Sequence, residues 1–123
     1  MDSILQSIRV SCGVDKDYNA FDNELIIDAN SVFTLLSRKG IGPSDGFSIT
    51  DESAEWSDYS DDDEVVNGVK EFVGLKVRML FDPPANGTIK QIFDEQLKEM
   101  EWQLYSMNPY LEFEDSNEEE EYL

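Results

Sequence analysis

The segment from Val65 to Phe81 constrains the fold more strongly than any other part of the chain. Its apolar residues cover most of the circumference of a helix, and such a helix is buried on several sides at once. Pro83 and Pro84 then stop the helix, because proline lacks a backbone N–H and moves the preceding residue out of the α region. We therefore predict a central helix that ends at Phe81, with Asp82 already outside it.

Three further helices are predicted from helical spacing and from end signals. They run from about Ser3 to Val10, from Phe21 to Lys39, and from Asn86 or Thr88 to Ser106. Along the last helix one apolar stripe is expected to face the core, made of Ile89, Ile92, Phe93, Leu97, Met100, Leu104 and Met107.

The helical period is absent from about residue 41 to residue 60. Phe47 and Ile49 alternate there with polar neighbours, as in a short strand or an extended loop. The expected fold is all-α: a small four-helix bundle with one long, partly extended loop and an acidic C-terminal arm. We expect residues 1–107 to form the helical domain and residues 108–123 to form the arm.

The net charge of −19 is concentrated in two segments. Residues 44–64 hold nine acids and no base, residues 99–123 hold another nine acids and no base, and the rest of the chain is nearly neutral. Surfaces of this kind repel phosphates, which excludes nucleic-acid binding through phosphate contacts.

The residue types present argue against catalysis and against metal binding. Histidine, the commonest general base and transition-metal ligand, is missing, and the single cysteine, Cys12, is expected as small core filler. The acids from Asp58 to Glu64 fit no register of a calcium loop and are expected to cap a helix. We predict that the protein is not an enzyme and has no cofactor or metal. No apolar run approaches the ~20 residues that span a bilayer, so no membrane partner is expected.

Aromatic and apolar residues near the C-terminus point to partners. Trp102 and Tyr105 lie on the face of the last helix opposite its apolar stripe, where large rings suggest a second contact. Tyr110, Leu111 and Phe113 follow in a segment that is too acidic to fold alone, and they are candidate anchors on another surface.

The loop and the central helix supply further candidate contact residues. Phe47, Trp56 and Tyr59 form either a small core that holds the loop down, a ligand cage, or a contact with a partner. Lys76 and Arg78 lie on the central helix, and Lys76 projects from its apolar side. An unpaired buried ammonium is costly, so we expect Lys76 to reach solvent or to meet a carboxylate inside or between subunits.

Several stretches occur together in order and at natural spacing. They are Phe21–Ile26 with Asn30–Phe33, Gly40–Phe47, Trp56, Val69–Pro84 and Glu101–Leu104. In these stretches the chain resembles the head-tail connector, or adaptor, proteins of long-tailed bacteriophages. The resemblance covers roughly residues 1–107, and the acidic segment after Asn108 lies outside it.

The resemblance implies a structural virion protein that forms a ring, usually of twelve copies, beneath the portal of the filled capsid. Such a ring links the capsid either to the stopper (or tail-completion) protein or to the tail. It leaves a channel through which genomic DNA passes without sequence-specific binding. The implied location is the virion neck, after assembly in the host cytoplasm. A helix that is apolar nearly all round, in a chain too small to cover it, also suits a subunit that packs against its neighbours.

Two other functions stay open. An acidic DNA-mimic inhibitor of a DNA-binding protein needs carboxylates fixed along a rigid surface, whereas eighteen of the nineteen net charges here lie in a loop region and a segment that ends in a tail. A general adaptor that binds a basic protein through the acidic tail is the third alternative.

Overall fold

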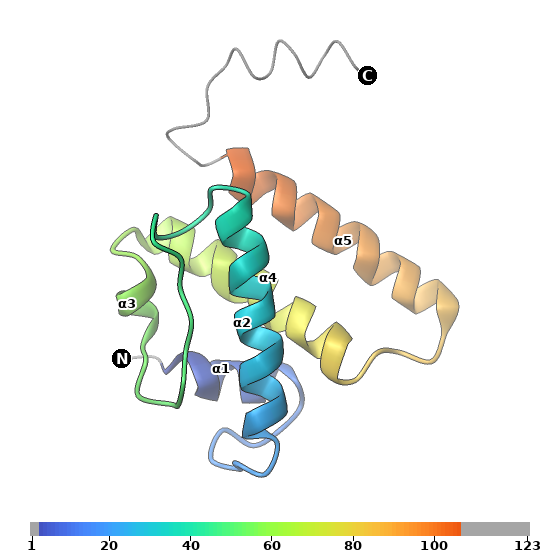
Figure 1. Ribbon diagram of the computed structural model, residues 1–123. Helices are drawn as coiled ribbons and strands as arrows, with labels where there is room; N and C mark the ends of the chain where they lie inside the picture. The colour runs from blue at the N-terminus through green and yellow to red at the C-terminus, as the bar shows by residue number, and fades with distance from the viewer. Residues whose placement is uncertain (1–2, 107–123) are drawn as a thin grey trace, which may run out of the picture.

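The computed structural model describes residues 3–106, and within this range the chain forms five α-helices (Figure 1). They are α1 (Ile4–Ser11), α2 (Asp22–Arg38), α3 (Trp56–Tyr59), α4 (Asp63–Phe81) and α5 (Gly87–Ser106). The four long helices are the predicted ones, so the all-α bundle is confirmed. The loop is extended in part, as expected, but it also contains α3, a four-residue helix that was not predicted.

Helix α4 lies at the centre of the bundle and packs against each of the other four helices. Its buried residues lie on several sides of the helix, as the sequence predicts: Val69, Phe72, Val73, Gly74 and Val77. The helix stops where the two prolines require, since Asp82 has left the α region with φ −145° and ψ 74°. At its start, the side chain of Asp62 accepts hydrogen bonds from the backbone N–H groups of Glu64 and Val65.

Two glycines let neighbouring helices approach α4 closely. A Cβ at Gly74 would lie 2.5 Å from Oγ of Ser11 on α1, and a Cβ at Gly68 would lie 2.9 Å from Cδ2 of Leu104 on α5. The contact between Gly68 and Leu104 brings the start of α4 to the end of α5, so the two helices run antiparallel.

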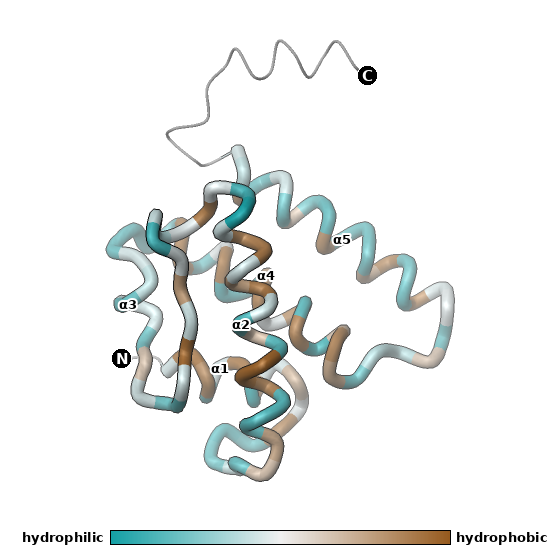
Figure 2. Tube along the Cα trace, in the orientation of Figure 1, coloured by the Kyte–Doolittle hydropathy of each residue, from teal (hydrophilic) through white to brown (hydrophobic). Residues whose placement is uncertain are grey.

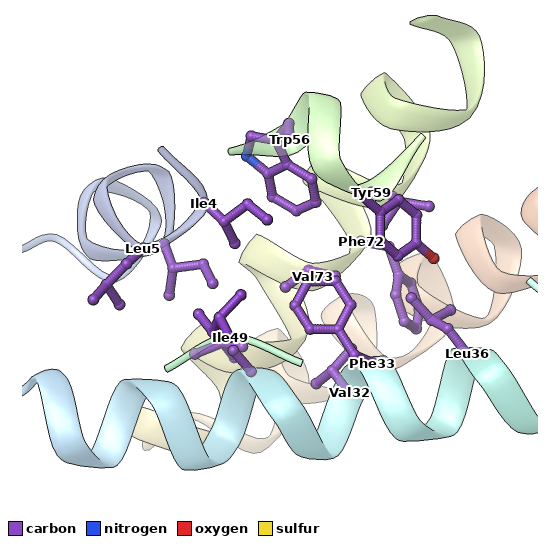
Figure 3. Close-up of a cluster of buried hydrophobic side chains, with 14 of the residues drawn as sticks. Ile4, Leu5, Val32, Phe33, Leu36, Ile49, Trp56, Tyr59, Phe72 and Val73 are labelled. Carbon is purple, nitrogen blue, oxygen red and sulfur yellow. The ribbon is translucent and has the colours of Figure 1, made fainter. Parts of the chain in front are cut away.

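The core lies between α1, α2, α4 and the loop (Figure 3). Phe33 of α2 is at its centre, with ring centroids 5.0 Å from Phe47, 6.1 Å from Trp56 and 5.5 Å from Tyr59. Along the trace, apolar residues concentrate on α1, α2 and α4, while α5 is largely hydrophilic with scattered apolar positions (Figure 2).

The extended part of the loop pairs with a side chain of α2, where a strand would pair with a neighbouring strand. The amide of Asn30 donates to the carbonyl of Ile49 at 3.0 Å, and its oxygen accepts from the N–H of Ile49 at 2.8 Å. This pair of bonds imitates the pairing of two strands. The loop is therefore fixed on α2 although the described residues contain no strand, only an isolated bridge between Ser3 and Glu55.

Candidate interaction surfaces

A buried arginine joins three segments that are distant in sequence. The guanidinium of Arg9, 1% exposed, binds both carboxylate oxygens of Asp22 at 2.9 and 2.7 Å. It also lies 3.0 Å from a carboxylate oxygen of Glu52 and donates to the carbonyl of Lys16. The hydrogen bond with Asp22 is the main reason why the pKa of Arg9 is raised, so the cation that holds α1, the link to α2 and the loop together persists at any ordinary pH.

The sequence interpretation missed Arg9, although a signal was present. Arg9 follows Leu5 by four residues and precedes Cys12 by three, which places it on the apolar side of α1. A charged residue on such a side needs a partner.

The loop aromatics form the small core that was one of the predicted alternatives. Trp56 and Tyr59 are buried, and Phe47 is half-buried. The indole of Trp56 donates to Oγ of Ser7 at 3.0 Å, and burial raises the pKa of Tyr59 to about 12. A partner could reach Trp56 and Tyr59 only if the loop moved, so a contact role for these residues stays a prediction.

Acidic side chains around α3 and the start of α4 face solvent. Asp58, Asp61, Asp63 and Glu64 are exposed, and Asp62 caps α4 while remaining exposed. The expectation that this acidic run caps a helix is confirmed. Within residues 3–106 no group of His, Cys, Asp or Glu is arranged to hold a metal ion. None of the described helices has the length and apolarity that crossing a membrane requires.

Trp102 and Tyr105 lie near the end of α5, with ring centroids 6.1 Å apart. Trp102 is 59% exposed, whereas Tyr105 is half-buried and packs against the core, so Trp102 provides most of this aromatic surface. An ion pair of 2.8 Å between Lys39 and Glu101 fixes the end of α2 to the same part of α5. The three predicted anchors Tyr110, Leu111 and Phe113 lie outside the described residues.

The apolar stripe of α5 is only partly covered by the core, which corrects the sequence prediction. Leu97 and Leu104 are buried, but Ile89 is 44% exposed and Ile92 is 56% exposed. The turn that begins at Pro83 carries the start of α5 away from α1, α2 and α3 (Figure 1), so no element within residues 3–106 covers this half of the stripe. We call the exposed pair Ile89 and Ile92 the α5 overhang.

Other apolar side chains are exposed where α2 begins and α4 ends. The ring of Phe21 lies 5.8 Å from Tyr18 and 5.2 Å from Phe81, both in edge-on contact. Tyr18, Phe21 and Leu80 are exposed. The end of the molecule where α4 stops therefore exposes apolar side chains among charged ones such as Asp17 and Asp82, and the end where α4 starts is acidic.

The predicted partners of the central cations are not found among the described ion pairs. Lys76 is half-buried and Arg78 is exposed. Within residues 3–106 the pairs formed by Arg9, Lys39 and Lys90 include neither of them. An ion pair between subunits stays a prediction for Lys76 and Arg78.

Comparison with known families assigns most of the chain. A family model described as phage connector protein matches residues 4–110, which include all five helices. No curated protein and no solved structure matches the chain significantly.

Proposed function

The chain belongs to the phage connector protein family, and from this premise we propose that it is a head-tail adaptor, a structural protein of the virion neck that assembles as a ring. The observation that carries the proposal is the extent of the family match, residues 4–110 of a chain of 123. In the proposed role the protein acts by contact and does not catalyse a reaction.

In the proposed assembly, twelve copies form a ring in the host cytoplasm, and the ring attaches to the portal and links the capsid to the stopper or tail.

 A subunit whose two ends differ makes heterologous contacts, and such contacts close into a ring when the rotation between neighbours allows it. The acidic end at the start of α4 and the exposed apolar side chains Tyr18, Phe21 and Leu80 at the other end make the two ends of this chain different.

The charge distribution supports a channel for DNA. Residues 44–64 contain nine acids and no base, and most of these acids are exposed. A surface without lysine or arginine makes no phosphate contacts and gains nothing from counterion release, so genomic DNA can slide past it. We propose that this acidic loop faces either the channel or the next component of the neck.

Electron microscopy of the full chain mixed with portal rings of the same phage tests the proposal. The expected result is an additional ring on one face of the portal, with portal alone as the control. Portal rings that stay unchanged at saturating protein would overturn the adaptor role. Inhibition of a DNA-binding protein, without portal attachment, would favour the DNA-mimic alternative.

The C-terminal arm provides a second test of the same role. We propose that Tyr110, Leu111 and Phe113 anchor the arm during assembly, together with the surface at Trp102 and Tyr105. A chain that ends after Asn108 should keep its helical circular dichroism and attach poorly to portals. Normal attachment of the shortened chain would argue against a role for the arm.

A further inference from the structure

We infer that the segment Tyr110–Phe113 of one copy docks on the α5 overhang of a second copy. This inference rests on the proposed ring, and it adds which surface of the subunit receives the arm. Three observations carry it: an uncovered apolar surface, the reach of the arm, and the charge on both sides.

The first observation is the surface itself. Ile89 and Ile92 are one helical turn apart on α5 and are 44% and 56% exposed. Leu80, near the end of α4, is also exposed. Within the described residues α5 packs mainly on α4, and the start of α5 lies apart from the other helices (Figure 1). Paired aliphatic side chains at this spacing suit the apolar side chains of an extended segment.

The second observation concerns reach, and it favours a second copy over the same chain. Ile89 precedes Ser106 by seventeen residues, which is about 25 Å along a helix. Tyr110 and Leu111 follow Ser106 by four and five residues, so full extension carries them about 14 and 18 Å. Ile92 precedes Ser106 by fourteen residues, about 21 Å, so Tyr110 and Leu111 fall short of both isoleucines in their own chain. Phe113, seven residues beyond Ser106, reaches about 25 Å, so at most one of the three anchors can meet the α5 overhang of its own chain.

The third observation is charge. The segment from Val65 to Lys98 holds five bases and four acids, a net charge of +1 in a chain of net charge −19. Lys90, next to Ile89 in the sequence, is exposed and is paired with Asp94 at 3.2 Å. Residues 108–123 contain seven acids and no base. An arm with this charge is attracted more to the Val65–Lys98 segment than to the acidic loop.

The arrangement fits a ring because each copy has its arm and the surface that receives a neighbour's arm at opposite ends of α5. The arm leaves each copy at the end of α5, and the α5 overhang lies at the start of the same helix. Each copy can then give an arm to one neighbour and receive an arm from the other, which is a heterologous contact.

Cysteine cross-linking of full-length chains tests the inference. One chain carries Ile92→Cys, and a second chain, distinguished by a size tag, carries Leu111→Cys. The two are mixed with portal rings and oxidised, and the mixed dimer is measured on a non-reducing gel. The native Cys12 interferes little, because it is buried and burial raises its pKa to about 11. A mixed dimer can form only between copies.

Ile27→Cys on α2 is the matched control, because Ile27 is 68% exposed and chance collisions would favour it over Ile92. A docked pair has an effective concentration near the millimolar range against micromolar free protein, so Ile92→Cys should give about tenfold more mixed dimer or better. Adding Ile92→Asp to an Ile89→Cys chain should lower cross-linking to Leu111→Cys about tenfold. Ile92 is already exposed, so this change should leave the circular dichroism unchanged.

The outcomes separate the inference from the proposed function. Attached rings with equal cross-linking at Ile92 and Ile27 would overturn the inference and leave the adaptor role intact. If no ring attaches, the adaptor role fails. The inference is then tested without portal: the two chains are mixed at high concentration, and cross-linking at Ile92→Cys is compared with cross-linking at Ile27→Cys. An intrachain bond in dilute chains that carry both Ile89→Cys and Leu111→Cys would also overturn it.

Discussion

Replacing Arg9 by methionine should destabilise the fold strongly. The substitution keeps an unbranched side chain in the buried position and removes the cation that binds Asp22, Glu52 and the carbonyl of Lys16. Removing one partner of a buried ion pair costs about 3–5 kcal/mol, because the remaining charge stays desolvated. The side chain of Asp22 is 23% exposed and that of Glu52 is more than half exposed, so water relieves part of this cost. We expect a loss near the lower limit, about 3 kcal/mol.

Urea unfolding, followed by the fluorescence of the buried Trp56, measures this loss. Arg38→Met is the matched control, because Arg38 is an exposed arginine near the end of α2, and its change should stay within about 0.5 kcal/mol. Glu52→Gln should cost no more than about 1 kcal/mol, as expected for an exposed partner.

A double-mutant cycle of Arg9→Met with Asp22→Asn isolates the central pair. Groups in one network couple by about 0.5–3 kcal/mol, and two hydrogen bonds in a fork place this pair in the upper half of that range. A loss below about 1 kcal/mol for Arg9→Met, or coupling near zero, would refute the view that Arg9 holds the three segments together.

Three further predictions test buried groups of the loop and the helices. Burial raises the pKa of Tyr59 to about 12, above its ordinary value of about 10, so the protonated phenol contributes its full stability below pH 10 and loses it as the pH rises through 12. In an ultraviolet titration, Tyr59→Phe should remove the tyrosine that ionises at the highest pH, and an unchanged titration would count against this. Gly42→Ala should lower the free energy of unfolding in urea by at least about 2 kcal/mol, because φ is +96° and the new Cβ would overlap the Tyr59 ring. In the control Gly87→Ala the new Cβ meets nothing within 4 Å and the change should be nearly neutral, so equal effects would contradict this account. Because desolvation raises the pKa of Cys12 to about 11, a thiol reagent at neutral pH should react with it slowly in the folded protein and rapidly in urea, and equal rates would show that the thiol is accessible.

The helix ends were predictable because their causes are local. Pro83 and Pro84 stop α4 through their own backbone chemistry, and Gly40, with φ +78°, follows the end of α2 as its sequence indicates. Helix α3 escaped prediction because four residues are too few to show a helical period. Its only local signal is the acid at Asp58, whose side chain accepts from the N–H of Glu55 at 2.8 Å.

The interaction surfaces depend on contacts that a single sequence does not display. Arg9 and Asp22 are thirteen residues apart, and Glu52 comes from a loop, so only the packed structure brings the three together. The α5 overhang shows a different limit. A stripe at helical spacing predicts that Ile89 and Ile92 become covered, but it does not tell whether the cover comes from the same chain or from a partner.

The proposed contact of the acidic loop with the next part of the neck can be tested by charge reversal, but the structure restricts the choice of residues. Asp62 must be kept, since its side chain caps α4 and an uncapped helix loses about 1 kcal/mol. Asp61→Lys with Asp63→Lys changes the charge by four and leaves the cap in place. Asp63 lies in the first turn of α4, where an acid contributes about 0.3–1 kcal/mol through the helix dipole.

A control must therefore carry the same dipole cost at a different place. Asp17→Lys with Glu24→Lys meets this requirement, because both residues are exposed and Glu24 lies in the first turn of α2. If the loop contacts the stopper or tail, the Asp61 and Asp63 variant should attach to portals and fail to recruit the next component in electron micrographs, while the control completes the neck. Complete necks with both variants would remove the acidic loop from the interface, and defects in both would trace the effect to helix stability or overall charge.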